Sequence, residues 1–348
     1  MSRETKAAIT FAGFALLLAF RDVATELFLS TQTATKEKTL WLSFMVCGTI
    51  LTLSCIRLLV RGQLGLLHKL MTPGALRKAT TLGLLSGGIY FLIFFIIGQL
   101  GAGVAGLIDY GLIPLATAVV GAMMFKEKLS ADFYGAFFVY LLGITILMVS
   151  RNEFIPLWLL GVAVLPPVAS ALSDGCTKWL LDEKNAGLTR AELLIVRFSP
   201  AVLVLYVLAA GTSGSLMPQI DAPFKTLAVA VVGGWVPLML LCTGLGMAGM
   251  KKLAAWEFTI PAVVFLGTLH RHPENVGVPM VGAILVLSGI VISEWKLISQ
   301  LNVRVRSAAR LTSRRVFAKF HSGVLYAVSF RRLLRRDSAT PEQHTNTY

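Results

Sequence analysis

The chain alternates long apolar stretches with short polar connections. Ten stretches have roughly 20 mostly apolar residues each, which is enough for a helix to cross a bilayer. The sequence lacks the strict alternation of a half-buried strand, and helices satisfy their own backbone hydrogen bonds in lipid. We therefore predict an all-α polytopic membrane protein. The predicted spans lie near residues 7–30, 40–60, 80–99, 103–125, 132–150, 156–180, 192–211, 226–247, 252–270 and 276–297.

Charged residues interrupt two of these spans. The first contains Arg21, Asp22 and Glu26, and the sixth contains Asp174 and Lys178. Asp22 and Glu26 are four residues apart and share a helix face, and the same spacing lets Asp174 and Lys178 pair within one helix. Because charges inside membranes usually pair, we interpret both groups as structural pairs near the membrane ends.

Composition supports the membrane assignment. Hydrophobic residues make up 55% of the 348 residues, charged residues make up 14%, and the mean hydropathy is +0.73. Soluble domains carry about 25% charged residues. The four cysteines all fall inside predicted spans, which suits apolar packing better than a disulfide framework or a metal cluster.

The two halves of the chain repeat each other. One group of glycines recurs 146 positions later, and a second group of residues recurs 147 positions later. Near the start of each half, Asp22-x-x-Thr25 also matches Asp174-x-x-Thr177, at an offset of 152. The first group is Gly87, Gly88, Gly98 and Gly103, matched by Gly233, Gly234, Gly244 and Gly249. The second is Pro114, Glu127 and Gly135, matched by Pro261, Glu274 and Gly282.

Each repeat holds five predicted spans, so the second enters the membrane from the opposite side. Inverted repeats are typical of secondary transporters, in which exchanging the conformations of the halves moves access from one side to the other. A duplicated channel or a duplicated enzyme scaffold is the alternative. We predict repeats over 1–150 and 151–297, followed by a tail over 298–348.

Basic residues predict the orientation. With a cytoplasmic N-terminus, the short inside segments carry 12 Lys and Arg residues and the outside segments carry 5, as the positive-inside rule requires. The tail then also lies inside. Its ten Lys and Arg residues alternate with apolar ones, which favours contact with anionic lipid headgroups, and no nucleic-acid motif accompanies them.

Two acids inside spans are the main functional candidates. Asp109 lies five residues before Pro114, and Glu257 lies four residues before Pro261. A carboxylate inside a membrane usually faces a cavity or a partner, so these two fit proton coupling or recognition of a cationic group. The alternative is that each is neutralised by a basic residue or reaches the nearer interface. The candidate basic partners are Arg197, Lys178 and Arg21.

Aromatic residues near the acids are further candidates. Tyr110 and Trp256 adjoin the acids, and the repeat pairs Asp109 with Trp256 and Tyr110 with Glu257. Aromatic side chains in spans can line a cavity and stack on a ligand, although packing and interfacial roles are commoner. Tyr90 and Trp235 complete this set.

An enzyme is not predicted. None of the five histidines lies in the middle of a span, and the sequence has no HExxH motif, phosphate loop or nucleophile elbow. His270 and His272 with Glu274 are too few ligands for a metal site without another nearby. We therefore predict no metal and no cofactor.

The stretch Gly111–Ile146 carries a family resemblance. It contains Pro114, then Glu127-Lys128-Leu129-Ser130, then Gly135 and Gly143, and it resembles the end of an EamA repeat in the drug/metabolite transporter superfamily. Arg197-Phe198 is similar to a pair early in the second helix of a repeat in that family. The second half keeps Pro261, Glu274, Gly282 and Gly289.

The resemblance implies a ten-helix carrier of small organic solutes such as metabolites, amino acids or drugs, often an exporter, in a bacterial inner membrane. It implies a substrate site between the halves, and it implies that Glu127 and Glu274 act as caps or loop anchors. The competing hypothesis is a channel or a non-transporting scaffold whose basic tail binds partners or lipid.

Overall fold

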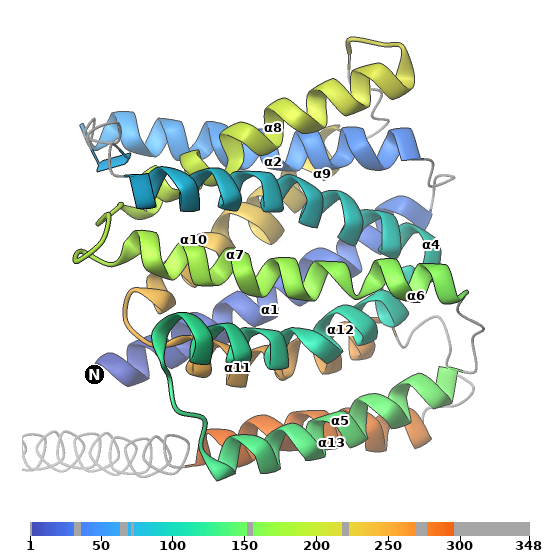
Figure 1. The fold of residues 1–348 in the computed structure, drawn as a ribbon. Helices are drawn as coiled ribbons and strands as arrows, with labels where there is room; N and C mark the ends of the chain where they lie inside the picture. Colours follow the sequence, from blue (N-terminus) through green and yellow to red (C-terminus); the bar gives the residue numbers. More distant parts are fainter. Residues whose placement is uncertain are drawn as a thin grey trace, which may run out of the picture. The chain divides into compact units, whose positions relative to one another are not determined.

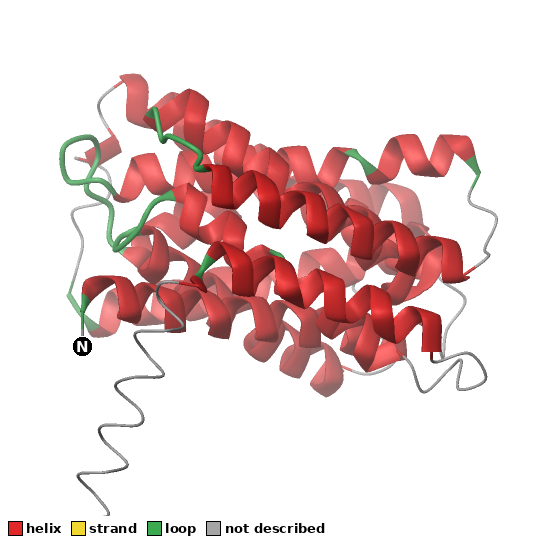
Figure 2. Cartoon of the chain, turned by 90° about the horizontal axis from the view of Figure 1, so that it is seen from below, coloured by secondary structure: helices red, strands yellow, loops and turns green. Residues whose placement is uncertain are grey.

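The computed structural model describes residues 2–30, 36–62, 69–70, 73–151, 156–217, 223–268 and 277–295. Within these ranges the regular structure is helical throughout and no strand occurs (Figure 2). The predicted all-α class is therefore confirmed. Glu274, His270, His272 and the tail over 298–348 lie outside the described residues.

Thirteen helical elements follow one another in the described ranges. The first half holds α1 (Arg3–Ser30), α2 (Lys36–Val60), α4 (Pro73–Phe125) and α5 (Ala131–Arg151). The second half begins with α6 (Leu157–Ala163), α7 (Leu165–Leu181), α8 (Arg190–Ser213) and α9 (Pro223–Ala230). A π-helical turn (Val231–Trp235) precedes α10 (Val236–Leu245), α11 (Met250–Glu257), α12 (Thr259–Thr268) and α13 (Gly277–Ser293).

Seven helical stretches in the described part of the chain are long and apolar enough to cross a membrane. One of them, over Gly74–Phe125, covers two predicted spans, and Gly101 interrupts it with φ 75° and ψ 158°. Glycine suits this position because a positive φ is strained for other residues. The predicted ninth and tenth spans correspond to α11, α12 and α13, which are shorter. The chain is therefore a multi-pass membrane protein.

Several helices are interrupted inside the bundle. Val164 separates α6 from α7, whose first turn contains Pro166 and Pro167. The π-helical turn precedes Pro237 in the first turn of α10. Phe258 separates α11 from α12. Proline cannot donate the helical hydrogen bond, which explains interruptions on its N-terminal side.

Helices from the two halves pack side by side. Figure 1 shows α5 lying along α13 and α2 lying near α8, and α1 packs against α10 and α12. Glycines allow the closest of these contacts. A Cβ on Gly143 of α5 would lie 2.7 Å from the carbonyl oxygen of Gly282 in α13, and a Cβ on Gly83 would lie 2.6 Å from Pro200 in α8. Gly135, by contrast, has no such neighbour within 4 Å.

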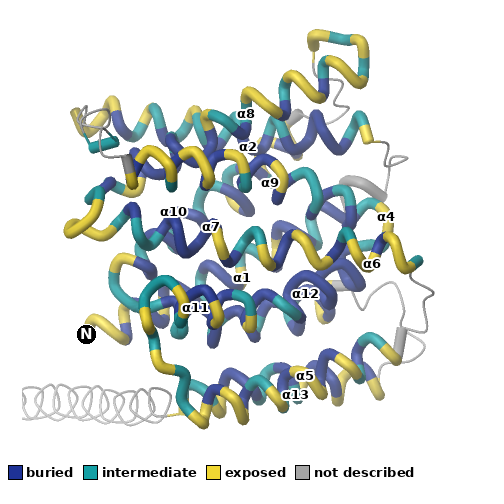
Figure 3. The backbone as a smooth tube through the Cα atoms, in the orientation of Figure 1, coloured by how far each residue is buried: buried dark blue, intermediate teal, exposed yellow. Residues whose placement is uncertain are grey.

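Polarity is distributed as expected for a protein in lipid. Large apolar side chains such as Leu59, Phe138 and Leu203 are exposed on the outer helix surfaces. Charged side chains including Asp22 and Arg197 are buried between the helices. Figure 3 shows buried positions along the sides of helices that face one another. The charges inside therefore belong to an interior site.

Candidate functional site

The site begins with what the two repeated prolines do to the backbone. A proline leaves the carbonyl four residues before it without a helical partner. For Pro114 that residue is Tyr110, whose carbonyl accepts a hydrogen bond from the Tyr140 hydroxyl. For Pro261 it is Glu257, the last residue of α11 before the interruption at Phe258. The prolines therefore leave the backbone carbonyls of Tyr110 and Glu257 without their helical donor, inside a continuous helix at Tyr110 and next to the interruption at Phe258 for Glu257.

A cavity of about 50 Å³ lies between helices of both halves. It has room for about three or four water molecules, and it is far below the roughly 300 Å³ of a small-molecule pocket. The cavity is therefore small in this conformation, and apolar and polar side chains both line it. Its polar and charged lining consists of Arg21 of α1, Tyr90, Asp109 and Tyr110 of α4, Ser170 and Asp174 of α7, Arg197 of α8 and Glu257 of α11.

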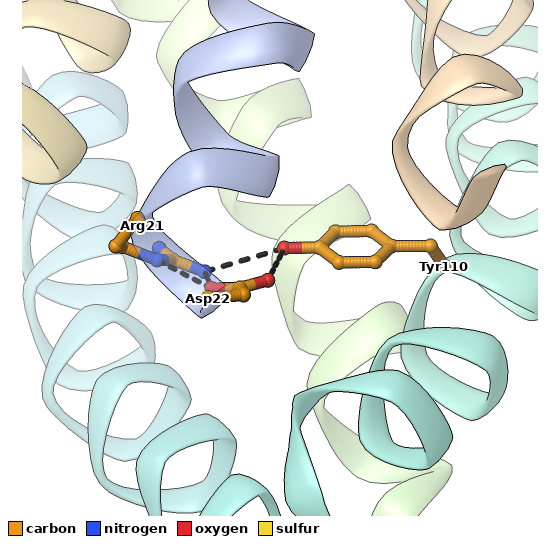
Figure 4. Close-up of polar contacts among 3 residues, drawn as sticks. All are labelled: Arg21, Asp22 and Tyr110. Atoms are coloured by element: carbon orange, nitrogen blue, oxygen red, sulfur yellow. Dashed lines mark hydrogen bonds and ion pairs between the residues drawn. The ribbon is translucent and has the colours of Figure 1, made fainter. Parts of the chain in front are cut away.

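Arg21 forms a three-residue network at one side of the cavity (Figure 4). Its Nε lies 2.7 Å from Oδ1 of Asp22, and its Nη2 lies 3.3 Å from the Tyr110 hydroxyl. That hydroxyl in turn donates to the other oxygen of Asp22. We expected the first-span charges near the membrane end. Arg21 instead lines the cavity, because its long side chain reaches both its sequence neighbour and Tyr110.

Arg197 faces a second acid across the cavity lining. Its Nη1 lies 3.8 Å from Oδ1 of Asp174, and its Nε donates to Oγ of Ser86 at 2.9 Å. The expected pairing of Asp174 with Lys178 is wrong, because Lys178 forms an ion pair with Glu127. Asp174 is buried at the cavity, whereas Lys178 lies one turn further along α7 and reaches the end of α4.

Asp109 and Glu257 both line the cavity, with 7% and 1% of their surfaces exposed. In the described residues neither oxygen of Glu257 has a hydrogen-bond partner, and neither has Oδ1 of Asp109. The Thr117 hydroxyl lies close to Glu257 without reaching hydrogen-bond geometry.

The basic residues we considered as partners for these acids are engaged elsewhere. Arg21 pairs with Asp22, Arg197 faces Asp174, and Lys178 pairs with Glu127. The alternative that Arg21, Arg197 or Lys178 neutralises Asp109 or Glu257 through an ion pair is therefore wrong for this conformation. Asp109 and Glu257 are therefore two carboxyl groups at the cavity that have no basic partner among the described residues.

The predicted aromatic residues divide into two groups. Tyr90 lines the cavity, with its ring centroid 5.7 Å from Cζ of Arg21. Trp235 lies toward α2 instead, where its Nε1 donates to Ser54 at 3.3 Å. Trp256 packs against the apolar clusters beside α5 and α13 and is not part of the cavity lining.

Sequence reasoning gave Arg21, Asp22 and Asp174 structural roles, although Arg21 and Asp174 belong to the cavity lining and Asp22 holds Arg21. One sequence signal could have found the two aspartates. The Asp-x-x-Thr pattern recurs in both halves, and Thr25 and Thr177 are buried without a hydrogen-bond partner for their hydroxyls in the described residues. The recurrence of this aspartate in both halves indicated that Asp22 and Asp174 occupy equivalent interior positions.

Glu127 lies at a second charged site, at the end of α4. Lys126 has a left-handed φ of 54°, and the backbone N–H of Glu127 donates to the carbonyl of Gly121 at 3.3 Å. The left-handed residue after the last turn reverses the chain direction, as at many helix ends, and directs Glu127 away from its own helix. The backbone conformation at Lys126 thus places the Glu127 carboxylate next to the second half of the chain.

Glu127 caps α11 from a distance of more than 100 residues. Its two oxygens accept from the backbone N–H groups of Met250 at 3.0 Å and Lys251 at 2.8 Å, and Lys178 forms an ion pair with it. These N–H groups have no partner inside their own helix, and a negative charge is favourable there. Burial alone would raise its pKa, but the hydrogen bonds from Lys178 and the two N–H groups hold the pKa of Glu127 below its usual value.

Comparison with known proteins bears on the fold only. No protein-family model matches the chain, and no curated protein matches it. A solved crystal structure of a protein is similar with a TM-score of 0.59, over 86% of this chain and 99% of that chain. The two sequences are 18% identical, so the likeness shows a shared fold.

Proposed function

We propose that the protein is a secondary transporter that moves small organic solutes by alternating access. The observation that carries this proposal is one buried cavity lined by charged side chains from both halves, with two carboxyl groups left without a cation. Such acids in a membrane protein are typical of substrate or proton pathways. The EamA resemblance of Gly111–Ile146 favours the same function, most often in the direction of export.

We further propose ten spans arranged as two inverted repeats. Helix pairing supports this arrangement. A two-fold axis in the membrane plane relates each helix of one half to an equivalent helix of the other half. Two equivalent helices then either pack on each other, or each packs on the counterpart of the other's neighbour. The second and seventh spans meet as α2 and α8, and the fifth and tenth meet as α5 and α13. The first span packs on the eighth (α1 on α10), and α7 of the sixth span packs on α4, which holds the third and fourth spans.

The interrupted helices also support a carrier. Binding sites in inverted-repeat transporters are commonly formed where helices are discontinuous near the membrane midplane. Here the π-helical turn contributes Gly233 and Gly234 to the cavity, and the interruption at Phe258 follows Glu257 directly. Irregular backbone in a membrane protein is tolerated where it lines an interior space.

Glu127 supplies a contact that closes one end of the carrier. It joins the first half to the N-terminus of α11, and Lys251 adds a hydrogen bond to Ser130 at 3.0 Å. Lys252 adds an ion pair with Glu294 at 3.6 Å. Separating the halves at this end would break the contacts of Glu127 and the hydrogen bond between Lys251 and Ser130, whereas the pair of Lys252 and Glu294 lies within the second half. By the distribution of basic residues this end is cytoplasmic, as are both termini, and the basic tail contacts anionic lipid.

Reconstitution in lipid vesicles tests the function. Vesicles loaded with a labelled extract of small metabolites should release a subset of them with saturable kinetics, and an imposed pH gradient should change the rate. Protein-free vesicles are the control. Ohmic conductance would favour a channel, and the absence of flux for every solute would favour a non-transporting scaffold. Either result would contradict the proposal.

A further inference from the structure

Polar groups of both signs are left unused at the cavity. Oδ1 of Asp109, both carboxyl oxygens of Glu257 and Nη1 of Arg197 make no hydrogen bond in the described residues. All three side chains line the cavity, and at most 7% of any of them is exposed. Buried polar groups ordinarily have partners, and leaving them without one is unfavourable. These three groups are therefore available to water or to a ligand that enters the cavity.

The signs of the unused groups restrict the ligand. Arg21 is committed to Asp22 and Tyr110. Arg197 lies 3.8 Å from Asp174, which is too far for a hydrogen bond, so its Nη1 remains an available donor. If all of these groups are charged, each arginine balances one acid, and Asp109 and Glu257 remain as two surplus negative charges. The cavity thus offers carboxylates to a cation and one guanidinium nitrogen to an anion.

We propose that the cavity binds a small zwitterion, with its ammonium group held by Asp109 and Glu257 and its anionic group held by Arg197. This inference rests on the proposed function, because a carrier admits its solute to the cavity. Binding itself requires only the cavity and its side chains. Since the enclosed space is about 50 Å³, the walls move apart when the ligand enters. Apolar side chains provide contact for an aliphatic body: Phe14, Leu18, Ile89, Ile93, Ile113 and Leu238.

Three probes of matched shape separate the possible ligand classes. Leucine carries both charges, isoamylamine is leucine without its carboxylate, and isocaproate is leucine without its ammonium group. Binding is measured at equilibrium on the full chain in lipid nanodiscs, with no gradient. Leucine should bind with a Kd at least about ten-fold lower than that of either analogue, because each analogue leaves one set of buried charged groups without a partner.

Variants assign each end of the ligand. Arg197→Gln should remove the advantage of leucine over isoamylamine, and Arg197→Lys, which keeps the charge, should restore part of it. Asp109→Asn combined with Glu257→Gln should remove the advantage of leucine over isocaproate. Arg77→Gln and Asp132→Asn change exposed residues and serve as matched controls that leave all three affinities unchanged. Thermal unfolding of each variant shows that it is folded.

Several results would overturn the assignment. Isoamylamine binding as tightly as leucine would identify a site for cations, and isocaproate doing so would identify a site for anions. Failure of all three probes to bind the folded wild type would also reject it. Vesicle flux confined to solutes that are not zwitterions would leave the carrier standing and reject this inference. Leucine binding with no flux of any solute would instead support the site and reject the carrier.

Discussion

Glu127 and Glu257 are two carboxyl groups in opposite situations. Glu127 is 18% exposed and receives hydrogen bonds from two backbone N–H groups and an ion pair from Lys178. Glu257 is 1% exposed, and its oxygens have no hydrogen-bond partner in the described part of the chain. A satisfied carboxylate holds parts of a protein together, whereas an unsatisfied buried one is available to a proton or a ligand. Under the proposed function, Glu127 is therefore a closing contact and Glu257 is part of the working site.

Replacing Glu257 should have the largest effect on function. We expect Glu257→Gln to abolish flux driven by a pH gradient, because the amide cannot carry a proton or hold a cation. Its melting temperature should not fall, because the change removes a buried carboxyl group whose oxygens have no hydrogen-bond partner in the described residues. Flux is measured in vesicles, with the exposed Glu183→Gln as the control. Unchanged flux would remove Glu257 from the mechanism.

Replacing Glu127 should have the largest effect on stability. Glu127→Ala removes the cap of α11 and leaves Lys178 without its acid, and losing a cap alone costs about 1–2 kcal/mol. We expect the melting temperature to fall by several degrees. Asp132→Ala, in an exposed position of the same region, should change it little. An unaltered melting temperature would show that the contact does not hold the halves together.

A smaller change tests the same contact from the other side. A Cβ on Gly249 would lie 2.6 Å from Oε1 of Glu127, so Gly249→Ala should displace the carboxylate and weaken the cap. We expect a loss of about 1 kcal/mol in the free energy of unfolding. Gly211→Ala has no neighbour within 4 Å and should be neutral or slightly stabilising. Equal stability of the two variants would contradict the assigned contact.

The smallest expected effect is a dependence on pH. Because the pKa of Glu127 is lowered in the folded protein, its stabilising contribution is complete above the unfolded pKa of about 4.3. It is lost as the pH falls through the lower folded pKa. The difference in melting temperature between wild type and Glu127→Gln should therefore shrink below about pH 4. A difference that stays constant there would argue against the ionised cap.

Sequence alone was enough for the helical class and for two of the acids. The length of apolar stretches is set by the bilayer, and Asp109 and Glu257, which both line the cavity, each lie shortly before a repeated proline. It was not enough for Arg21, Asp174 or the partner of Glu127. Those contacts depend on side chains that reach across helices, and Glu127 meets a helix that begins more than 100 residues later. The local pattern of apolar and polar residues does not predict contacts between residues so far apart in the sequence.

The most direct test measures flux and thermal stability together for Glu257→Gln and Glu127→Ala in the same vesicles. We predict opposite patterns. Glu257→Gln should lose pH-driven flux and keep its melting temperature, whereas Glu127→Ala should lose several degrees of melting temperature and keep measurable flux. If both variants lose flux and stability together, or if Glu257→Gln transports like the wild type, the division between a closing contact and a working carboxyl group is contradicted.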